Sequence, residues 1–477
     1  MQKNKITNPS VFKKYDIRGI VNQDLIIDEI YQLTRAIATY LKQQEPVLNT
    51  LIVGMDGRTH SAAIKEHVCA ALQDHGINVI FIGTCTTPAF YYANEILNAS
   101  GGIMITASHN PKEYNGLKIR LNKENVFDQE IVTIKNIFFA NHAYSHANVH
   151  GTYQEQDVIT PYILLLEYQF KHLKNIQLKA IIDCAHGATA TIIPTLVKRM
   201  GWNNMQVLYG TIDGTFPAHE ADPTKEENIL ELRNLVRQQP ETVGISFDGD
   251  GDRFLALTEN GAMLRGDELS TIFCQAIKKE LGSFKLAIDI KCSSVLLAQL
   301  HAWELEYILT PCGVGFVRKA MQKTTALFGG ELSCHFCFAD RYFGYDDGIY
   351  AMMRLIEFLT LTQKSLQEVS DQLPARFCSP ELRINCTNDQ KFAIVEQIKQ
   401  QVSTYPNSRL ITIDGIRLEL PNGCITLRAS NTEPVLSLRF EGSNQKNLDL
   451  ITREFSTLLL PHFDRAYLEK TLNLTGI

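Results

Sequence analysis

The hydrophobic and polar positions along the chain predict a repeated structural unit. Three apolar, strand-like runs each end in an aspartate, and each is followed by a loop of small residues and a helix-like segment. These runs are residues 51–56, 180–183 and 286–289. Strands that alternate with helices in this way are typical of α/β architecture. The pattern therefore predicts three similar α/β units.

Each predicted unit contains a second strand that runs into a polar loop. The strands and their loop residues are 103–105 with Ser108, 243–247 with Asp248, and 326–328 with Glu331. In open α/β sheets, ligand-binding groups gather beyond the carboxyl ends of the strands. We therefore expect these three loops to face one central cleft.

The pattern changes beyond residue 372. Short apolar segments at 409–413, 415–420 and 424–427 are broken by Asp-Gly and Asn-Gly turns, which are hairpin signals. Helix-like runs at 388–405 and 445–460 lie on either side of them. This part of the chain is therefore predicted to be an α+β domain with a small antiparallel sheet.

The full prediction is three α/β mixed-sheet domains and a C-terminal α+β domain around a central cleft. The expected boundaries are 1–150, 151–256, 257–371 and 372–477. The joint at residues 139–152 carries His142, His146 and His150 at helical spacing, which could form a metal-binding face. Their polar neighbours favour a linker instead.

Composition and charge restrict the class of function. The chain has 477 residues, 45% hydrophobic and 21% charged, without a membrane-spanning apolar run or a signal-peptide segment, so we expect a cytoplasmic protein. A formal net charge of −6 and the absence of a basic run argue against a nucleic-acid partner. The eleven cysteines read as reduced thiols, and Cys334 and Cys337 form a Cys-x-x-Cys pair that is weak evidence for zinc.

Residues 101–118 contain a candidate nucleophile. Ser108 follows a short apolar strand, and His109 and Lys118 are the nearest titratable groups that could activate its hydroxyl. The stretch could therefore hold a covalent intermediate. Taken alone, a Ser-His pair of this kind is more often a loop serine beside a surface histidine.

The segment Asp248-Gly-Asp-Gly-Asp-Arg253 is the strongest chemical signal. Three carboxylates separated by glycines bring hard oxygen ligands together on a tight turn, which suits Mg²⁺. An EF-hand calcium loop is the alternative, with Glu259 at its twelfth position, but Arg253 stands where that loop has glycine and the flanking residues predict strands. A magnesium site for phosphoryl transfer is the better interpretation.

Two further loops carry groups suited to a sugar phosphate. The segment from Arg428 to Pro434 combines a cation, three side-chain hydrogen-bonding groups and turn amides, as a phosphate cradle would, although a capped turn has the same composition. Glu331 and Ser333 could hydrogen-bond vicinal sugar hydroxyls.

These four motifs, in this order, resemble the α-D-phosphohexomutase superfamily, and most closely its bacterial phosphomannomutase/phosphoglucomutase group. The resemblance begins at Tyr15-Asp-Ile-Arg18-Gly and runs almost to the C-terminus. It implies that Ser108 is a phosphoserine and belongs with Asp248, Asp250 and Asp252 to the metal site. The implied catalytic residues are Ser108, His109, Lys118, Arg18 and Arg253. The implied substrate-binding residues are Tyr15, Lys291, Glu331, Ser333, His335, Arg428, Ser430, Asn431 and Thr432.

The activity implied is reversible phosphoryl transfer between O1 and O6 of a hexose through a hexose 1,6-bisphosphate, which also serves as activator, with Mg²⁺ as cofactor. Tyr114-Asn-Gly and Leu332 favour mannose or glucose over an aminosugar, and phosphoglucosamine mutase is the alternative enzyme. Two residues depart from the patterns that the resemblance implies. Val314 stands at the histidine of Thr-Pro-x-Gly-His, and Cys334 stands at the glycine of Glu-x-Ser-Gly-His. The expected partner is a small sugar phosphate, with no nucleic acid and no membrane, and the protein is expected to be a monomer or weak dimer.

Two other functions are compatible with these motifs. The chain could be a non-catalytic sugar-phosphate-binding protein that kept the fold, or a phosphatase in which water takes the serine-bound group. A non-catalytic protein would be expected to lose its nucleophile or metal ligands, and Ser108 and the three aspartates are all present.

Overall fold

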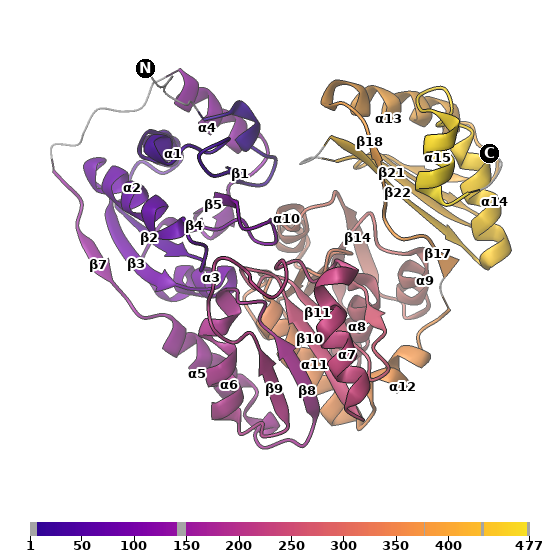
Figure 1. Ribbon diagram of the computed structural model, residues 1–477, viewed down its shortest axis with the longest axis horizontal. Helices are drawn as coiled ribbons and strands as arrows, with labels where there is room; N and C mark the ends of the chain where they lie inside the picture. The colour runs from indigo at the N-terminus through magenta and orange to yellow at the C-terminus, as the bar shows by residue number, and fades with distance from the viewer. Residues whose placement is uncertain (1–6, 141–148, 376, 431–433, 475–477) are drawn as a thin grey trace. The chain divides into compact units, whose positions relative to one another are not determined.

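The computed structural model describes residues 7–140, 149–375, 377–430 and 434–474. The chain divides into two compact units. The first unit comprises Met1–Arg265 and Ser333–Ser370, and the second comprises Gly266–Leu332 and Asp371–Ile477 (Figure 1).

The first unit begins with a 7-stranded mixed sheet in the order β1-β5-β4-β2-β3-β7, with β6 paired to β5. Its strands are β1 (Ile17–Ile20), β2 (Thr50–Met55), β3 (Asn78–Thr84), β4 (Gly101–Ile105), β5 (Tyr114–Leu121), β6 (Glu124–Asn125) and β7 (Tyr153–Glu155). The helices are α1 (Ile30–Gln44), α2 (Ser61–Asp74), α3 (Thr87–Ile96) and α4 (Gln129–Phe139). Apolar residues of α1, α2 and α4 share one core with the strands. The antiparallel pairing of β4 with β5 places Met104 opposite Lys118, so both ends of the serine loop are fixed by the sheet.

A second, 5-stranded sheet in the same unit runs β12-β11-β10-β8-β9. Its strands are β8 (Lys179–Asp183), β9 (Met205–Leu208), β10 (Thr242–Phe247), β11 (Phe254–Leu257) and β12 (Met263–Leu264). The helices of this part are α5 (Ile159–Gln169), α6 (Ile193–Met200), α7 (Leu230–Gln238), α11 (Gly348–Thr362) and α12 (Leu366–Asp371), and β16 (Phe336–Phe338) precedes α11. Since β10 and β11 are antiparallel and fully buried, the aspartate-rich loop between them is held at a hairpin turn.

In the second unit, β14 (Glu306–Thr310), β13 (Lys285–Asp289) and β15 (Phe328–Gly330) lie side by side and are parallel. They are accompanied by α8 (Gly266–Leu281), α9 (Ser294–Ala302) and α10 (Val314–Thr324). This third strand–helix set has the alternation that the sequence predicts.

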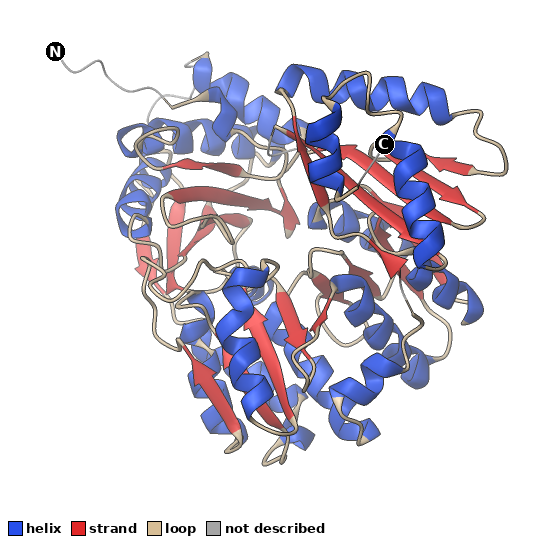
Figure 2. Cartoon of the chain, turned by 45° about the vertical axis from the view of Figure 1, so that its right-hand side comes forward, coloured by secondary structure: helices blue, strands red, loops and turns tan. Residues whose placement is uncertain are grey.

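The rest of the second unit is a 6-stranded antiparallel sheet in the order β17-β22-β21-β20-β19, with β18 paired to β22. The strands are β17 (Phe377–Cys378), β18 (Leu382–Asn385), β19 (Arg409–Ile411), β20 (Ile416–Leu420), β21 (Gly423–Ala429) and β22 (Val435–Gly442). Helices α13 (Asn388–Val402), α14 (Gln445–Ser456) and α15 (Arg465–Leu472) share an apolar core with it (Figure 2).

The predicted fold class is confirmed. The three apolar runs ending in aspartate form β2, β8 and β13, and the tail forms an antiparallel sheet with helices. His142 and His146 lie outside the described residues, and His150 pairs with Asp74 at 3.2 Å.

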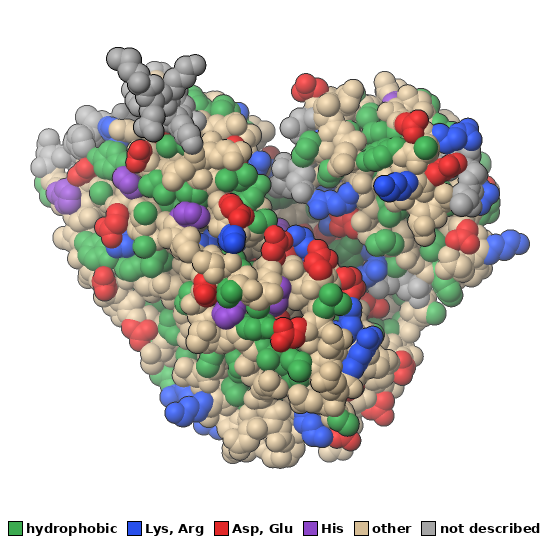
Figure 3. Space-filling view, viewed as in Figure 1, with side chains coloured by type: hydrophobic (Ala, Val, Ile, Leu, Met, Phe, Trp, Pro, Cys, Tyr) green, Lys and Arg blue, Asp and Glu red, His purple; other side chains and the backbone are tan. Residues whose placement is uncertain are grey.

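On the visible face, acidic and basic side chains are interspersed (Figure 3). Among the residues that the structure describes, no helix is long and apolar enough to cross a membrane.

Candidate active site

Ser108 lies in the loop that follows the buried strand β4. Its backbone has φ 51°, a left-handed conformation that residues other than glycine adopt infrequently. The side-chain hydroxyl donates to Asp248 Oδ2 at 2.7 Å, and the Oγ lies 3.1 Å from Nδ1 of His109. The structure thus places the candidate nucleophile within hydrogen-bond distance of the aspartate-rich loop.

The aspartate-rich loop approaches the serine loop closely because it contains glycine. A Cβ atom at Gly249 would lie 2.5 Å from the carbonyl oxygen of Ser108, and Gly251 has φ 74°. Any side chain at Gly249 would push the two loops apart. The glycines that separate the aspartates in the sequence therefore have a steric function as well as a conformational one.

Asp248, Asp250 and Asp252 form a buried cluster suited to a divalent cation. Each offers a ligand oxygen, and these oxygens lie within 4.8 Å of one another. Burial, together with the charges of Asp252 and Asp250, raises the pKa of Asp248 well above its ordinary value. Asp250 Oδ1 is buried and has no hydrogen-bond partner among the described residues. Hard, crowded carboxylate oxygens, one of which accepts no hydrogen bond from the described residues, fit a metal ion such as Mg²⁺.

Glu259, the twelfth residue of the alternative EF-hand loop, lies elsewhere. Its carboxylate accepts backbone N–H groups of Leu366 and Gln367 at 2.9 and 2.7 Å, at the start of α12. The loop that carries the aspartates joins two strands, whereas an EF-hand loop joins two helices. The structure therefore disagrees with the EF-hand interpretation.

Lys118 on β5 reaches the same cluster. Its Nζ lies 2.7 Å from Asp250 Oδ2 and 2.5 Å from Asp252 Oδ2. Burial alone would lower the pKa of Lys118, but the charges of Asp250 and Asp252 raise it well above its usual value. The two carboxylates therefore favour the protonated, cationic form of Lys118.

In contrast to Lys118, His109 has a pKa that its surroundings lower. Burial, followed by the positive charges of Arg253 and Arg18, lowers the pKa of His109 well below its ordinary value. The imidazole is therefore neutral at physiological pH. Arg18 also supports the loop, because its Nη1 donates to Ala107 O at 3.0 Å and to Asn110 Oδ1 at 2.6 Å.

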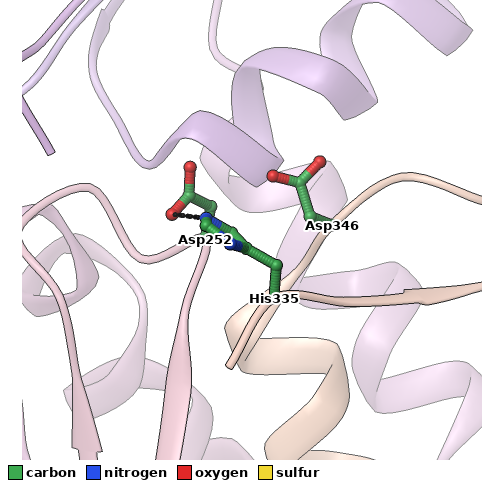
Figure 4. Close-up of side chains that lie close together, drawn as sticks. All are labelled: Asp252, His335 and Asp346. Atoms are coloured by element: carbon green, nitrogen blue, oxygen red, sulfur yellow. Dashed lines mark ion pairs between the residues drawn. The ribbon is translucent and has the colours of Figure 1, made fainter. Parts of the chain in front are cut away.

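A second strand-like segment brings His335 to the cluster. His335 pairs with Arg253 in an isolated β-bridge, and Arg253 Nε lies 3.3 Å from His335 Nε2. His335 Nε2 is also 3.3 Å from Asp252 Oδ1, with Asp346 beside them (Figure 4). Ser333 Oγ lies 3.3 Å from His335 Nδ1. Tyr15 precedes β1 and is half-buried.

The remaining predicted residues belong to the second unit. Lys291 Nζ lies 3.5 Å from a Glu381 oxygen, and its charge lowers the pKa of Glu381 to about 2. Glu331 Oε1 accepts the Gly313 N–H at 2.6 Å.

The cradle segment is described only in part. Arg428 donates to Asp414 Oδ2 through Nε at 3.0 Å and Nη2 at 2.7 Å. The Ser430 carbonyl accepts from Lys391 Nζ at 2.6 Å. Asn431 and Thr432 lie outside the described residues.

Two residues of this site were missed by the sequence reasoning. Arg58 is buried and donates to backbone carbonyls of the serine loop, and Thr106 Oγ1 accepts the Ser108 N–H at 2.8 Å. Arg58 follows the first apolar run in the segment Asp56-Gly-Arg58. The sequence offered one signal for Arg58, namely its position two residues after the aspartate that ends the predicted strand.

Comparison with known proteins identifies the family. Four consecutive regions match the domains of one family, described as phosphoglucomutase/phosphomannomutase: domain I at residues 9–145, II at 161–261, III at 265–377 and the C-terminal domain at 381–458. The chain belongs to the phosphoglucomutase/phosphomannomutase family.

Relatives in the phosphoglucomutase/phosphomannomutase family are similar over almost their whole length. A phosphomannomutase/phosphoglucomutase of Pseudomonas aeruginosa is 34% identical over 451 residues, which is 94% of this chain and 95% of the relative. A phosphoglucomutase of Neisseria gonorrhoeae is also 34% identical, covering 94% and 96%. A Burkholderia thailandensis crystal structure described as a family member has a TM-score of 0.87 and 27% identity, covering 96% of this chain and 98% of that one.

Cys334, which stands where the family resemblance implies a glycine, lies next to His335. Cys334 is buried and has φ 69°, so its backbone is in the region that favours glycine. Its carbonyl accepts the Phe254 N–H at 3.2 Å, next to the bridge between Arg253 and His335. The cysteine therefore retains the conformation that a glycine would adopt with less strain. Val314, the other departure, begins α10.

Proposed function

We propose that the protein interconverts the 1-phosphate and 6-phosphate of a hexose, mannose or glucose, through phosphorylated Ser108. Family membership makes it a mutase, that is, an intramolecular phosphotransferase. The observation that supports the serine route best is the 2.7 Å hydrogen bond from Ser108 Oγ to Asp248, inside the buried carboxylate cluster. A serine hydroxyl held among metal-ligand carboxylates is suited to phosphoryl transfer.

In the proposed reaction, the phosphoryl group of phosphoserine 108 passes to the free hydroxyl of the sugar phosphate. The bond from Ser108 Oγ to phosphorus breaks and a bond from the sugar oxygen to phosphorus forms. The proton that the sugar hydroxyl loses is balanced by the proton that Ser108 Oγ takes up as it becomes a free hydroxyl. The product is a hexose 1,6-bisphosphate, which turns end for end. Ser108 then accepts the other phosphoryl group, so that the phosphoserine is restored.

Charged residues around Ser108 have separable roles in this proposal. Asp248, Asp250 and Asp252 would hold Mg²⁺, which would offset negative charge on the phosphoryl oxygens when bound. Lys118 and Arg253 supply further positive charge beside the same carboxylates. His109, being neutral, can orient the Ser108 hydroxyl without adding charge.

We assign the other end of the substrate to residues that the family resemblance implies. Arg428 and Ser430, with Asn431 and Thr432, would bind the phosphate that is not reacting, because a guanidinium fork matches phosphate oxygens. By the family resemblance, Lys291, Glu331, Ser333 and His335 would bind the sugar. The bisphosphate would act as both intermediate and activator, since it can phosphorylate Ser108.

The identity of the hexose is proposed from two sequence features and from the activities for which the relatives are named. Leu332 and Tyr114 favour mannose or glucose over glucosamine. Structural neighbours also include an Aspergillus fumigatus N-acetylphosphoglucosamine mutase, but at 13% identity and a TM-score of 0.61 this likeness concerns the fold alone. We therefore propose mannose and glucose phosphates as the substrates.

A substrate panel tests the proposal. Purified protein with Mg²⁺ and a trace of glucose 1,6-bisphosphate should convert mannose 1-phosphate and glucose 1-phosphate to the 6-phosphates, as followed by ³¹P NMR, with little conversion of glucosamine 6-phosphate. Inorganic phosphate should not accumulate. Release of phosphate instead of isomerisation would support a phosphatase, and binding without turnover would support a non-catalytic protein.

A further inference from the structure

The backbone of Ser108 is held in a conformation that costs free energy. Its φ of 51° lies in the left-handed region, where the Cβ of an L-residue comes close to its own carbonyl oxygen. Such a conformation persists only where the surroundings determine it. The residues that hold Ser108 in this state therefore contribute to the direction of its hydroxyl.

Two buried side chains hold the backbone of Ser108 from opposite ends. Thr106 Oγ1 accepts the Ser108 N–H at 2.8 Å, and Arg58 Nη2 donates to the Ser108 carbonyl at 2.8 Å. Thr106 is 1% exposed and Arg58 is 3% exposed, so water does not compete for either bond. Both polar groups of the Ser108 peptide backbone are therefore fixed by side chains.

Arg58 fixes the rest of the loop in the same way. Its guanidinium donates to three other loop carbonyls, namely Asn110 at 2.6 Å, Pro111 at 2.7 Å and Tyr114 at 3.1 Å. Its own position is set by Asp56, whose Oδ2 lies 3.1 Å from Nε, and by the ring of Phe216 at 5.2 Å. A planar fork with five donors can hold several carbonyls at once, which a lysine ammonium cannot do in the same geometry.

The metal loop leaves little room for Ser108 to relax. A Cβ at Gly249 would lie 2.5 Å from the Ser108 carbonyl oxygen, so this oxygen is packed between the metal loop and Arg58. A change in the Ser108 backbone would move the carbonyl and would turn Oγ away from Asp248.

We propose that Thr106 and Arg58 are positioning residues that keep Ser108 in its left-handed conformation and thereby direct Oγ to Asp248. The inference rests on the proposed function, because it explains how the nucleophile is oriented. It predicts an effect on the transfer step and not on sugar-phosphate binding. Neither side chain touches Ser108 Oγ.

The test uses Thr106→Val, which keeps the shape and removes the acceptor. The dephosphorylated enzyme is mixed with glucose 1,6-bisphosphate, and phosphorylation of Ser108 is followed by intact mass against time, with kcat and KM measured in parallel. We expect Thr106→Val to slow phosphorylation and to lower kcat by about tenfold or more, with KM changed by less than about threefold. Thr106→Ser retains the hydroxyl and should restore the wild-type rate.

A matched control separates this effect from general destabilisation. Thr258 is also fully buried, and its Oγ1 accepts the backbone N–H of Ala262 at 3.2 Å, so Thr258→Val removes the same kind of acceptor outside the serine loop. This control should phosphorylate at the wild-type rate. Arg58→Lys keeps the charge but not the fork, and should lower the phosphorylation rate in the same way as Thr106→Val. It keeps the inference testable if Thr106→Val does not fold.

The outcomes are distinguishable. If wild-type protein is never phosphorylated on Ser108, the proposed function fails and the inference fails with it. If the wild type is phosphorylated and Thr106→Val and Arg58→Lys react at the same rate, the proposed function stands and the positioning role is wrong. A rise in KM with unchanged kcat would also contradict the inference, because it would indicate a role in substrate binding.

Discussion

Ser108 Oγ donates a 2.7 Å hydrogen bond to Asp248 Oδ2, although 140 residues separate them in the chain. One residue follows a strand of the 7-stranded sheet and the other follows a strand of the 5-stranded sheet. The candidate nucleophile and the candidate metal-binding loop, which come from two different sheets, therefore meet within the first unit.

Removal of one carboxylate should weaken metal binding. Asp250→Asn keeps the shape of the side chain but removes a charged oxygen ligand, so the dissociation constant for Mg²⁺ should rise by about tenfold or more. Isothermal titration calorimetry measures this directly, with turnover in excess chelator as a second readout. Full turnover in excess chelator would contradict the metal assignment.

Glu259→Gln provides the matched control for that measurement. Glu259 is the residue that an EF-hand loop would use, but its carboxylate accepts backbone N–H groups at the start of α12. Its substitution should lower stability slightly and leave Mg²⁺ affinity unchanged. A loss of affinity equal to that of Asp250→Asn would favour the EF-hand interpretation.

Site residues that lie in short motifs were predictable from the sequence. Site residues whose side chains bond to the backbone of another segment were not. Ser108 and the three aspartates stand in loops whose glycines and turn residues are visible in the sequence. Arg58 and Thr106 act on carbonyl and amide groups, and such contacts depend on loop geometry that residue types do not specify. Arg58 alone, read in sequence, is an ordinary charged residue.

The fold, like the motif-bearing loops, was predictable where consecutive residues form a recognisable pattern. Apolar runs ending in aspartate are long enough to identify β2, β8 and β13, whereas the short β12 and β16 have too few residues for a pattern. The four domain boundaries stay predictions. The residue type of Cys334 gives no indication of its φ of 69°, and only the glycine at this place in the family pattern points to a left-handed backbone.

Arg428 should contribute to substrate affinity more than to the transfer step. Arg428→Ala removes the fork that we assign to the non-reacting phosphate, so KM for glucose 1-phosphate should rise by about tenfold or more, with a smaller change in kcat. Arg428→Lys should give an intermediate KM, since it keeps charge without the fork.

Arg409→Ala, at an exposed arginine of β19, is the control for Arg428. It should leave KM unchanged. An unchanged KM in Arg428→Ala would place the phosphate cradle elsewhere.

His219 should make stability depend on pH. Burial alone would lower the pKa of His219, but its hydrogen bond to Asp183 and the charge of that aspartate raise the pKa above 6.5, with His219 Nε2 and Asp183 Oδ2 3.0 Å apart. The folded protein therefore holds this proton more tightly than the unfolded chain. The stabilisation is complete below pH 6.5 and is lost as the pH rises through the folded value.

Urea unfolding at several pH values above and below 6.5 measures this dependence. His219→Gln should reduce the loss of unfolding free energy that accompanies rising pH, whereas His462→Gln, remote in the sequence and in the second unit, should not. Equal pH dependence in the wild type and in His219→Gln would show that the pair of His219 and Asp183 is not the cause.

The central claim is that Ser108 carries the phosphoryl group during turnover. Intact-mass measurement after incubation with glucose 1,6-bisphosphate tests it most directly, with peptide mapping to locate the added phosphate and with Ser108→Ala in parallel. The account predicts one added phosphate, on Ser108, in the wild type, none in Ser108→Ala, and loss of nearly all mutase turnover in a variant that remains folded. Wild-type turnover in Ser108→Ala, or a phosphate located on another residue, would contradict it.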